Sequence, residues 1–146
     1  MQRIKFILPC KGFSLNAAYY STRKVKTKDC RDWEDMVLAH LLRIPELRPQ
    51  EDFVGEVEVW LNFYYPESIF WTKQRLISAK TFDVDNSPKL LIDLIFGGCL
   101  KINDKFIRRI HSEKNPGATW AIEVILELKP YDDPDGTSGF GSGSNP

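Results

Sequence analysis

Hydrophobic and polar positions alternate along several stretches of this chain. Successive side chains of a β-strand point to opposite faces, so such alternation predicts strands with one buried face. The clearest case is 54–65, where Val57, Val59 and Leu61 face one way and glutamates face the other. An Asn-Pro-Gly turn at 115–117 is expected to join the last two strands. The strands are expected at about 3–8, 54–65, 105–112 and 119–128.

A spacing of three to four residues between apolar positions marks two other stretches and predicts amphipathic helices. In the first, at about 28–43, Trp33, Val37 and Leu41 form the apolar stripe. Between the second strand and the second helix, 66–82 has no firm periodicity. We interpret that segment as a basic loop with aromatic residues.

The second helix is expected at about 85–96, with leucine and isoleucine as its apolar content. Asp85 is a good N-cap candidate, and Pro88 then falls in the first turn, where its missing N–H costs little. Gly97 and Gly98 are expected to end the helix as C-cap residues. The order β-α-β-α-β-β predicts an α/β (α+β) domain with a mixed sheet.

Length and composition bound the class of protein. The 146 residues, 42% of them hydrophobic, fit one domain, which we place at 1–129. The acidic tail at 130–146 is rich in Gly and Ser and buries too little apolar surface to fold. Three widely spaced cysteines, Cys10, Cys30 and Cys99, favour free thiols over a disulfide framework or a zinc site. No apolar run is long enough for a membrane span and no signal peptide precedes the first strand, so we expect a soluble intracellular protein.

The formal net charge is zero, with 20 basic and 20 acidic residues, which by itself argues against a nucleic-acid partner. Three of the acidic residues lie in the tail, however, so residues 1–129 hold 20 basic and 17 acidic groups, a net charge of +3. The basic residues also gather in clusters, which could attract phosphates or could be an ordinary solvated surface. The clusters are Arg23, Lys24, Lys26 and Lys28; Lys73, Arg75 and Lys80; and Lys101, Lys105, Arg108 and Arg109.

Acidic side chains flank the second predicted helix. Asp83 and Asp85 are one residue apart in an extended segment, which places both carboxylates on the same side. Asp104 follows the helix, and a chain that runs out and returns could bring this third carboxylate close. Clustered carboxylates repel one another unless a divalent cation such as magnesium neutralises them. Lys89, about one helical turn beyond Asp85, could reach the same pocket.

Such a site suits phosphodiester hydrolysis, because magnesium polarises a phosphate oxygen and lowers the pKa of a bound water. From spacing alone, two helix-capping aspartates and an unrelated turn aspartate stay an open alternative. A calcium-sensor loop is excluded, since Pro88 and Leu94 stand where an EF-hand counted from Asp83 needs glycine and glutamate. A covalent aspartyl-phosphate is a weak alternative, because no buried apolar strand precedes Asp83.

The stretch 80–93, Lys-Thr-Phe-Asp-Val-Asp-Asn-Ser-Pro-Lys-Leu-Leu-Ile-Asp, resembles the signature of RusA-type Holliday junction resolvases, the crossover junction endodeoxyribonucleases. That pattern is roughly K-x-x-D-[LIV]-D-N-x-x-K-x-x-x-D, then a glycine and an acidic pair before a strand. Every spacing from Asp83 to Asp93 is kept. Upstream, a proline-ended strand followed by S-x-N-x-x-Y at 14–19 is similar to the family as well. The resemblance covers about 4–128.

The resemblance implies a small homodimeric endonuclease, of a kind often encoded by phages and prophages, which acts in the bacterial cytoplasm on four-way or other branched DNA. It implies paired symmetric nicks made with magnesium, for which manganese could substitute, and no membrane partner. Two equivalent sites match a two-fold symmetric junction. By position, the catalytic residues are Asp83, Asp85, Lys89 and Asp104, of which the three aspartates bind metal, while Asn86 and Asp93 support the site, Asp93 by orienting Lys89.

On the same basis, several cations are expected to meet DNA phosphates, which fix position more than sequence. Phe70 and Trp71 could stack on opened bases, or could pack beneath a loop or in a dimer interface. Tyr19 and Tyr20 could pack or contact the DNA backbone, whereas His111 is expected to be structural. The cations are Arg23, Lys24, Lys26, Lys28, Lys73, Arg75 and Lys80.

The sequence departs from the family pattern in three places, and none of them removes a catalytic group. Ser87-Pro88 replaces the usual apolar-plus-variable pair, Asn103 stands where many members have an aspartate, and the segment after Pro9 lacks a second proline. Two other functions stay open. One is a RusA-fold dimeric branched-DNA-binding protein with weak cleavage, and the other is a nuclease for other branched or single-stranded DNA.

Overall fold

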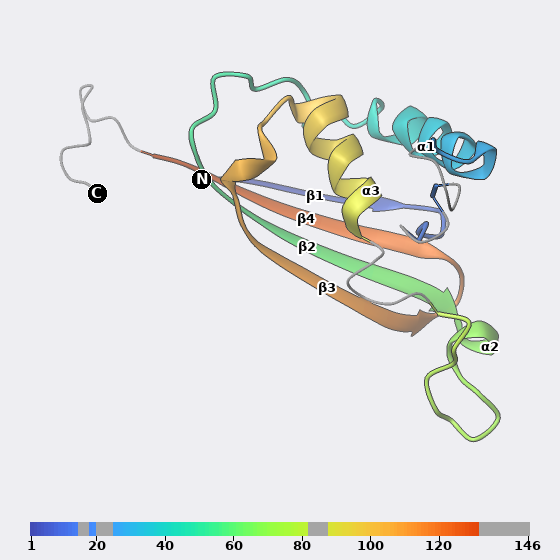
Figure 1. Cartoon of the computed structure of the whole chain (residues 1–146). Coiled ribbons are helices and arrows are strands. Elements are labelled where there is room, and N and C mark those ends of the chain that lie inside the picture. Colours follow the sequence, from blue (N-terminus) through green and yellow to red (C-terminus); the bar gives the residue numbers. More distant parts are fainter. Residues whose placement is uncertain (15–17, 20–24, 82–87, 132–146) are drawn as a thin grey trace.

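The computed structural model describes residues 1–14, 18–19, 25–81 and 88–131. Strands and helical segments follow one another along these residues (Figure 1). The strands are β1 (Gln2–Leu8), β2 (Gly55–Pro66), β3 (Ile107–Gly117) and β4 (Ala121–Pro130). The helical segments are α1 (Lys28–Leu41), α2 (Glu67–Phe70), α3 (Pro88–Ile92), the π-helix η2 (Asp93–Leu100) and the 3-10 turn η3 (Asp104–Phe106).

The strands form one sheet in the order β1-β4-β2-β3. β4 runs antiparallel to both of its neighbours, whereas β2 and β3 are parallel. A parallel pair needs a crossover connection, because the chain must return to the end where it started. This crossover contains α3 and η2. The expected mixed sheet is therefore confirmed.

The helices α1 and α3 lie on the same face of the sheet (Figure 1). Alternate residues of the inner strands are buried beneath them, among them Val59, Leu61 and Val124, each 0% exposed. From α1, Val37 and Leu41 add apolar side chains that are also fully buried. The alternation in the strands and the spacing in the helix therefore identified the core correctly.

The helix that begins with α3 is longer than the sequence predicts, because it continues as the π-helix Asp93–Leu100. Gly97 and Gly98 lie inside this π-helix, so the expectation that they end the helix is wrong. The cap is Lys101, which has a left-handed backbone (φ 56°) and whose ammonium donates to the Gly97 carbonyl at 3.0 Å. Leu100 beyond the glycines is fully buried. Its packing helps to offset the roughly 1 kcal/mol that each glycine costs inside a helix.

β3 also runs farther than the sequence predicts. The turn expected at 115–117 is wrong, because β3 continues to Gly117 and pairs with β2 over that stretch, with Pro116 opposite Tyr65. A proline is tolerated there since β3 lies at the edge of the sheet and does not need that N–H for a second neighbour. The turn to β4 consists of residues 118–120, and residues 105–106 belong to η3 rather than to the strand.

Three further expectations can be compared with the described residues. The segment 66–82 is not wholly a loop, since it contains α2. The three cysteines are free, as the sequence predicts, and all three are buried. No helix in the described part of the chain is long and apolar enough to cross a membrane.

Candidate active site

Lys89 lies in the first turn of α3, directly after Pro88, which can start a helix because the first turn needs no backbone donor. Its ammonium donates a hydrogen bond to Oδ1 of Asp93 at 2.9 Å. Residues four apart lie on one face of a helix, so the pair follows from the sequence spacing. Asp93 could orient the Lys89 side chain only through a bond of this kind.

The surroundings of Lys89 raise the pKa of its ammonium above the usual value. The hydrogen bond to Asp93 is the largest cause, and partial burial opposes it. The charges of Asp93 and Asp104 and the phenol of Tyr19 raise the pKa further, which places Asp104 and Tyr19 within electrostatic reach of this lysine. Lys89 is therefore a cation at neutral pH, suited to offsetting negative charge rather than to abstracting a proton.

Asp104 begins η3, at the far end of the helix from Lys89 in the sequence. The local turn is fixed by Asn103, whose side-chain oxygen accepts a hydrogen bond from the Lys105 backbone N–H at 2.9 Å. Asparagine and aspartate cap helices about equally well, so Asn103 can make the turn that an aspartate would make at this position. The Asp104 side chain is exposed, and it forms no ion pair with any described residue.

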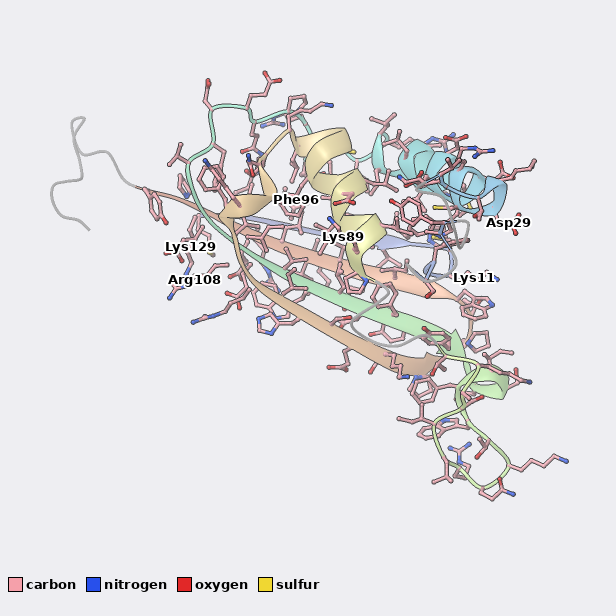
Figure 2. The ribbon with its side chains drawn as sticks, viewed as in Figure 1. Lys11, Asp29, Lys89, Phe96, Arg108 and Lys129 are labelled. Carbon is pink, nitrogen blue, oxygen red and sulfur yellow. The ribbon has the colours of Figure 1, made fainter. Side chains whose placement is uncertain are left out.

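A groove of about 630 Å³ joins Lys89 and Asp104. Its walls come from α3, η3 and β3, which the crossover brings together, and Figure 2 shows Lys89 on α3 over the sheet. The walls are mostly apolar, and the polar side chains among them are Lys89, Asp104 and Ser112. A DNA strand could place a phosphate at Lys89 and the carbon atoms of its sugar against the isoleucines. The lining residues are Pro88, Lys89, Ile92, Asp104, Ile107, Ile110 and Ser112.

Several predicted site residues lie outside the described residues. The structure does describe the residues on either side of 82–87, which are Thr81 and Pro88. Thr81 is buried and its hydroxyl accepts a hydrogen bond from the ammonium of Lys114 on β3 at 2.8 Å. Pro88 lines the groove beside the same strand. Among the described His, Cys, Asp and Glu side chains, no group of three could hold a metal ion. The predicted residues outside the described ones are Tyr20, Arg23, Lys24, Asp83, Asp85 and Asn86.

The predicted DNA-contacting cations that are described divide into two groups. Lys26 and Lys28 each pair with a carboxylate of α1, Glu34 and Asp32 respectively, at 2.6 Å. Their charges are thus partly offset within the protein. The cations that follow β2 pair with no acid among the described residues, and they are Lys73, Arg75 and Lys80.

Tyr19 is a neighbour of the site that sequence spacing did not assign. Its backbone pairs with that of Lys26 in an isolated bridge, which holds the segment before α1. Its phenol raises the pKa of both Lys26 and Lys89, so it lies within electrostatic reach of both cations. With 39% of the residue exposed, Tyr19 is accessible to a bound phosphodiester. The S-x-N-x-x-Y pattern was the signal for it.

Two aromatic expectations can be decided from packing. Phe70 is 3% exposed and lies 6.2 Å from Tyr65, ring centre to ring centre, so the packing alternative holds for Phe70 and stacking on bases does not. His111 stacks on Trp60 at 5.0 Å and its Nε2 lies 2.6 Å from a carboxylate oxygen of Glu58. These contacts agree with the structural role expected for His111.

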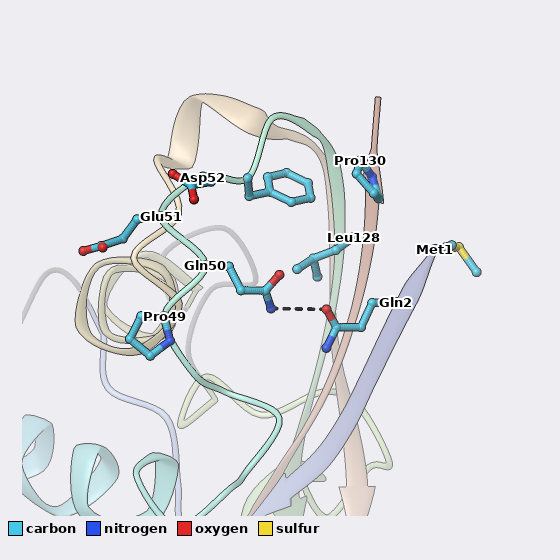
Figure 3. Close-up of a pocket in the computed structure, with 9 residues that line it drawn as sticks. Met1, Gln2, Pro49, Gln50, Glu51, Asp52, Leu128 and Pro130 are labelled. Atoms are coloured by element: carbon cyan, nitrogen blue, oxygen red, sulfur yellow. Dashed lines mark hydrogen bonds between the residues drawn. The ribbon is translucent and has the colours of Figure 1, made fainter. Parts of the chain in front are cut away.

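A second hollow, of about 640 Å³, lies at the end of the sheet where the chain begins (Figure 3). Gln50 crosses it and donates to the side chain of Gln2 at 3.2 Å. Its charged side chains are Glu51 and Asp52, and no lysine or arginine of the described chain lines it. Carboxylates without such cations repel phosphates, so the groove at Lys89 is the better candidate for a nuclease site.

Comparisons with known proteins identify the family of the chain. A search of curated proteins finds no match to the chain. The family described as Endodeoxyribonuclease RusA matches residues 13–127. The matched region runs from the segment before α1 into β4 and includes every residue that lines the groove. The chain therefore belongs to the RusA endodeoxyribonuclease family.

Proposed function

We propose that this protein is a magnesium-dependent endonuclease that resolves four-way DNA junctions by paired, symmetric nicks. The observation that carries the proposal is the groove shared by Lys89 and Asp104 in a chain of the RusA family. Phosphodiester cleavage needs carboxylates to hold a metal and a cation to offset charge on the phosphate. The sequence adds two carboxylates directly before α3, Asp83 and Asp85.

Asp83, Asp85 and Asp104 would hold the metal. Carboxylate oxygens are hard ligands that suit Mg²⁺, and Mn²⁺ accepts the same ligands. Asp104 fits this role, because its carboxylate lines the groove, is exposed and is paired with no described cation. When bound, the ion supplies a polarised phosphate oxygen and a water of lowered pKa.

Lys89 would bind the phosphate that is cut. Its raised pKa keeps the ammonium charged through the neutral range, so it offsets the charge that develops on the phosphate or on the leaving oxygen. Asp93 would act as a positioning residue, since its hydrogen bond restricts where the ammonium can lie. Preorganisation of this kind lowers the barrier because the cation needs no rearrangement when charge develops.

We infer that the protein acts as a homodimer, because paired nicks in a two-fold symmetric junction need two equivalent sites. The position of β3 supports this inference. β3 has eleven residues, lies at the edge of the sheet and has β2 as its one strand neighbour among the described residues. Natural proteins usually cover long exposed edges, and a second copy paired along β3 would do so. Sedimentation velocity at micromolar protein should give a dimer, and a monomer on the junction would contradict this.

The experiment that tests the proposed function uses a synthetic four-way junction with each strand labelled in turn. We expect two symmetric nicks with Mg²⁺ or Mn²⁺ and none with EDTA. Asp85→Asn should bind the junction at least as tightly as the wild type but should not cut it, because one metal ligand and one negative charge are lost. Cleavage by this variant at the wild-type rate would rule out the metal site.

Competition between substrates separates the remaining functions. Unlabelled four-way junction should compete far better than linear duplex, flap or single-stranded DNA of the same length. If a flap or a single strand competes equally and is cut, the protein is a nuclease of broader substrate range. If the junction is bound but never nicked with either metal, the protein is a branched-DNA-binding protein.

A further inference from the structure

Residues 71–77, which follow α2, form a compact turn that extends beyond the ends of β2 and β3 (Figure 1). Trp71 and Ile77 pair across its base. Further along, the Thr72 N–H donates to the Leu76 carbonyl at 2.8 Å, and the Thr72 hydroxyl accepts from the Leu76 N–H at 3.1 Å. These bonds give the turn a defined shape, and we call it the 71–77 hairpin.

The hairpin is anchored at its base by aromatic packing. The Arg75 guanidinium lies over the Trp71 ring at 4.8 Å, and Trp71 in turn packs edge to face on Phe70 at 4.7 Å. Phe70 is buried, so this stack ties the hairpin to the core. Arg75 has a left-handed backbone (φ 63°), which side-chain-bearing residues rarely adopt. Such conformations persist where the surroundings enforce them, often at functional segments.

The hairpin is also coupled to the groove. Residue Thr81, a few positions after the hairpin, is buried and bonded to Lys114 of β3 at 2.8 Å. The same strand lines the groove through Ile110 and Ser112. The segment that follows the hairpin therefore contacts the same strand that lines the groove.

The outer surface of the hairpin carries apolar and cationic side chains together. Leu76 is 65% exposed and Ile77 is 55% exposed, and two adjacent exposed apolar residues on the returning arm of a projecting hairpin are unfavourable in water. Lys73, Arg75 and Lys80 surround them in the sequence, and no Asp or Glu occurs from 68 to 82. Cations that pair with no described acid are available to phosphates, while exposed aliphatic side chains pack against bases that have lost their stacking partners.

We propose that the 71–77 hairpin is a structure-selecting element that reaches into the centre of a branched DNA. Lys73, Arg75 and Lys80 contact phosphates there, and Leu76 and Ile77 pack against the bases that open at the branch point. Continuous duplex offers stacked bases and so gives these two side chains nothing to bury against. This inference rests on the proposed function and adds a reason for a preference for four-way DNA.

The charges favour DNA over a second copy of the chain as the occupant. A dimer contact through the hairpin would bring two clusters of like charge together, which is unfavourable. Each cation that binds a phosphate instead releases counterions, and this release favours binding to DNA. A dimer interface at the hairpin is consequently an outcome that the test must be able to detect.

The test compares two double variants with the wild type in EDTA, so that binding is measured without cutting. Leu76→Ser with Ile77→Ser should bind the four-way junction roughly tenfold more weakly and bind duplex unchanged. Lys73→Gln with Lys80→Gln should weaken both and should reduce the slope of log affinity against log salt by about 0.9 for each phosphate that is no longer neutralised. A 2-aminopurine at the branch point should brighten on binding the wild type and less on binding the serine variant.

Matched controls remove similar side chains elsewhere. Leu42→Ser deletes an apolar residue that is 66% exposed, and Arg43→Gln with Arg48→Gln deletes two exposed cations that follow α1. These variants should bind the junction as the wild type does. All variants change exposed residues, so circular dichroism and the melting temperature should be unchanged.

The outcomes distinguish this inference from the proposed function. If the wild type prefers junctions and both hairpin variants bind as the wild type does, the hairpin inference is wrong and the proposed function stands. If the serine variant changes the sedimenting mass instead of the binding, the hairpin is a dimer contact. If the wild type shows no preference for branched DNA, both proposals are wrong.

Discussion

Replacing Asp93 by asparagine tests whether Asp93 positions the Lys89 ammonium for cleavage or only stabilises the fold. The substitution keeps the shape of the side chain and removes its charge. The two side chains are 54% and 44% exposed, so solvent screens the ion pair, and exposed pairs at this spacing contribute about 0.3–0.5 kcal/mol. The free energy of unfolding should therefore fall by about 0.5 kcal/mol, which lowers the melting temperature by roughly 1–2 °C in a chain of this size.

Cleavage should fall much more than stability. Without the hydrogen bond at 2.9 Å, the Lys89 ammonium is free to leave the phosphate, and small displacements of such groups cost about tenfold to hundredfold in rate. An ordinary lysine pKa is about 10.4, so Lys89 stays charged at pH 7 in both proteins. A slower rate at pH 7 therefore reports the position of the ammonium rather than its protonation.

The pH dependence gives an independent check. Asp93 raises the pKa of Lys89, so the charged pair adds stability below the unfolded-state lysine pKa of about 10.4 and loses it as the pH rises through the folded-state pKa. The alkaline decline of cleavage should consequently begin at lower pH in Asp93→Asn than in the wild type. Junction affinity at pH 7 should change little.

The assay is single-turnover cleavage of a four-way junction with magnesium, at several pH values, beside thermal unfolding of the same proteins. Asp32→Asn is the matched control, because Lys28 and Asp32 form a pair of the same spacing on α1. It should lose similar stability without slower cleavage. Asp93→Glu, which keeps the charge, should recover part of the rate. If Asp93→Asn cuts as fast as the wild type while its melting temperature falls, Asp93 is merely stabilising.

Four other predictions concern the site and the core. Asp104→Asn should bind the four-way junction but lose more than 90% of cleavage, roughly the effect of removing a metal ligand, and unchanged cleavage would remove Asp104 from the site. Gly55→Ala should lower the melting temperature clearly, because the added Cβ would overlap the backbone oxygen of Lys129. Leu61→Ala, at a fully buried position, should cost about 2–5 kcal/mol in denaturant unfolding, and a smaller loss would mean that the core closes around the cavity. Burial raises the pKa of the Cys10 thiol to about 11, so it should react with a thiol reagent at pH 8 after unfolding but very slowly before.

The local pattern of the sequence was enough for the elements that depend on local geometry. Alternation predicted β2, whose inward residues are buried, and the spacing of Val37 and Leu41 predicted α1. The pair of Lys89 with Asp93 follows from the pitch of one helix turn. In each case the contacting residues lie within a few positions of one another, so the period of the chain fixes which face they share.

Element boundaries were less predictable, because they depend on neighbours far away in sequence. The Asn-Pro-Gly stretch at 115–117 has every local feature of a turn, but pairing with β2 keeps it extended. Gly97 and Gly98 likewise have the local features of a helix end, yet packing of the residues beyond them continues the helix. Local preferences of about 1 kcal/mol are outweighed by a strand ladder or by burial of a leucine.

Charge patterns alone could not decide which cations are available for DNA. The stretch around Lys26 and Lys28 looks as basic as the one around Lys73. However, acids of α1 pair with Lys26 and Lys28, whereas Lys73 is exposed on the 71–77 hairpin. The sequence alone also could not decide which apolar residues of this segment are exposed. Packing buries Phe70 and leaves Leu76 exposed.

The sequence by itself determined the strands, the first helix and a family signature whose residues lie within one short segment. Only the tertiary structure decided that Asp104 shares a groove with Lys89 and that Tyr19 lies near that lysine. It also decided that Asn103 caps a turn and that a hairpin projects beyond the ends of β2 and β3. The physical reason is that periodicity encodes which face a residue occupies, whereas the approach of distant residues is set by the crossover between β2 and β3 and by burial against the sheet.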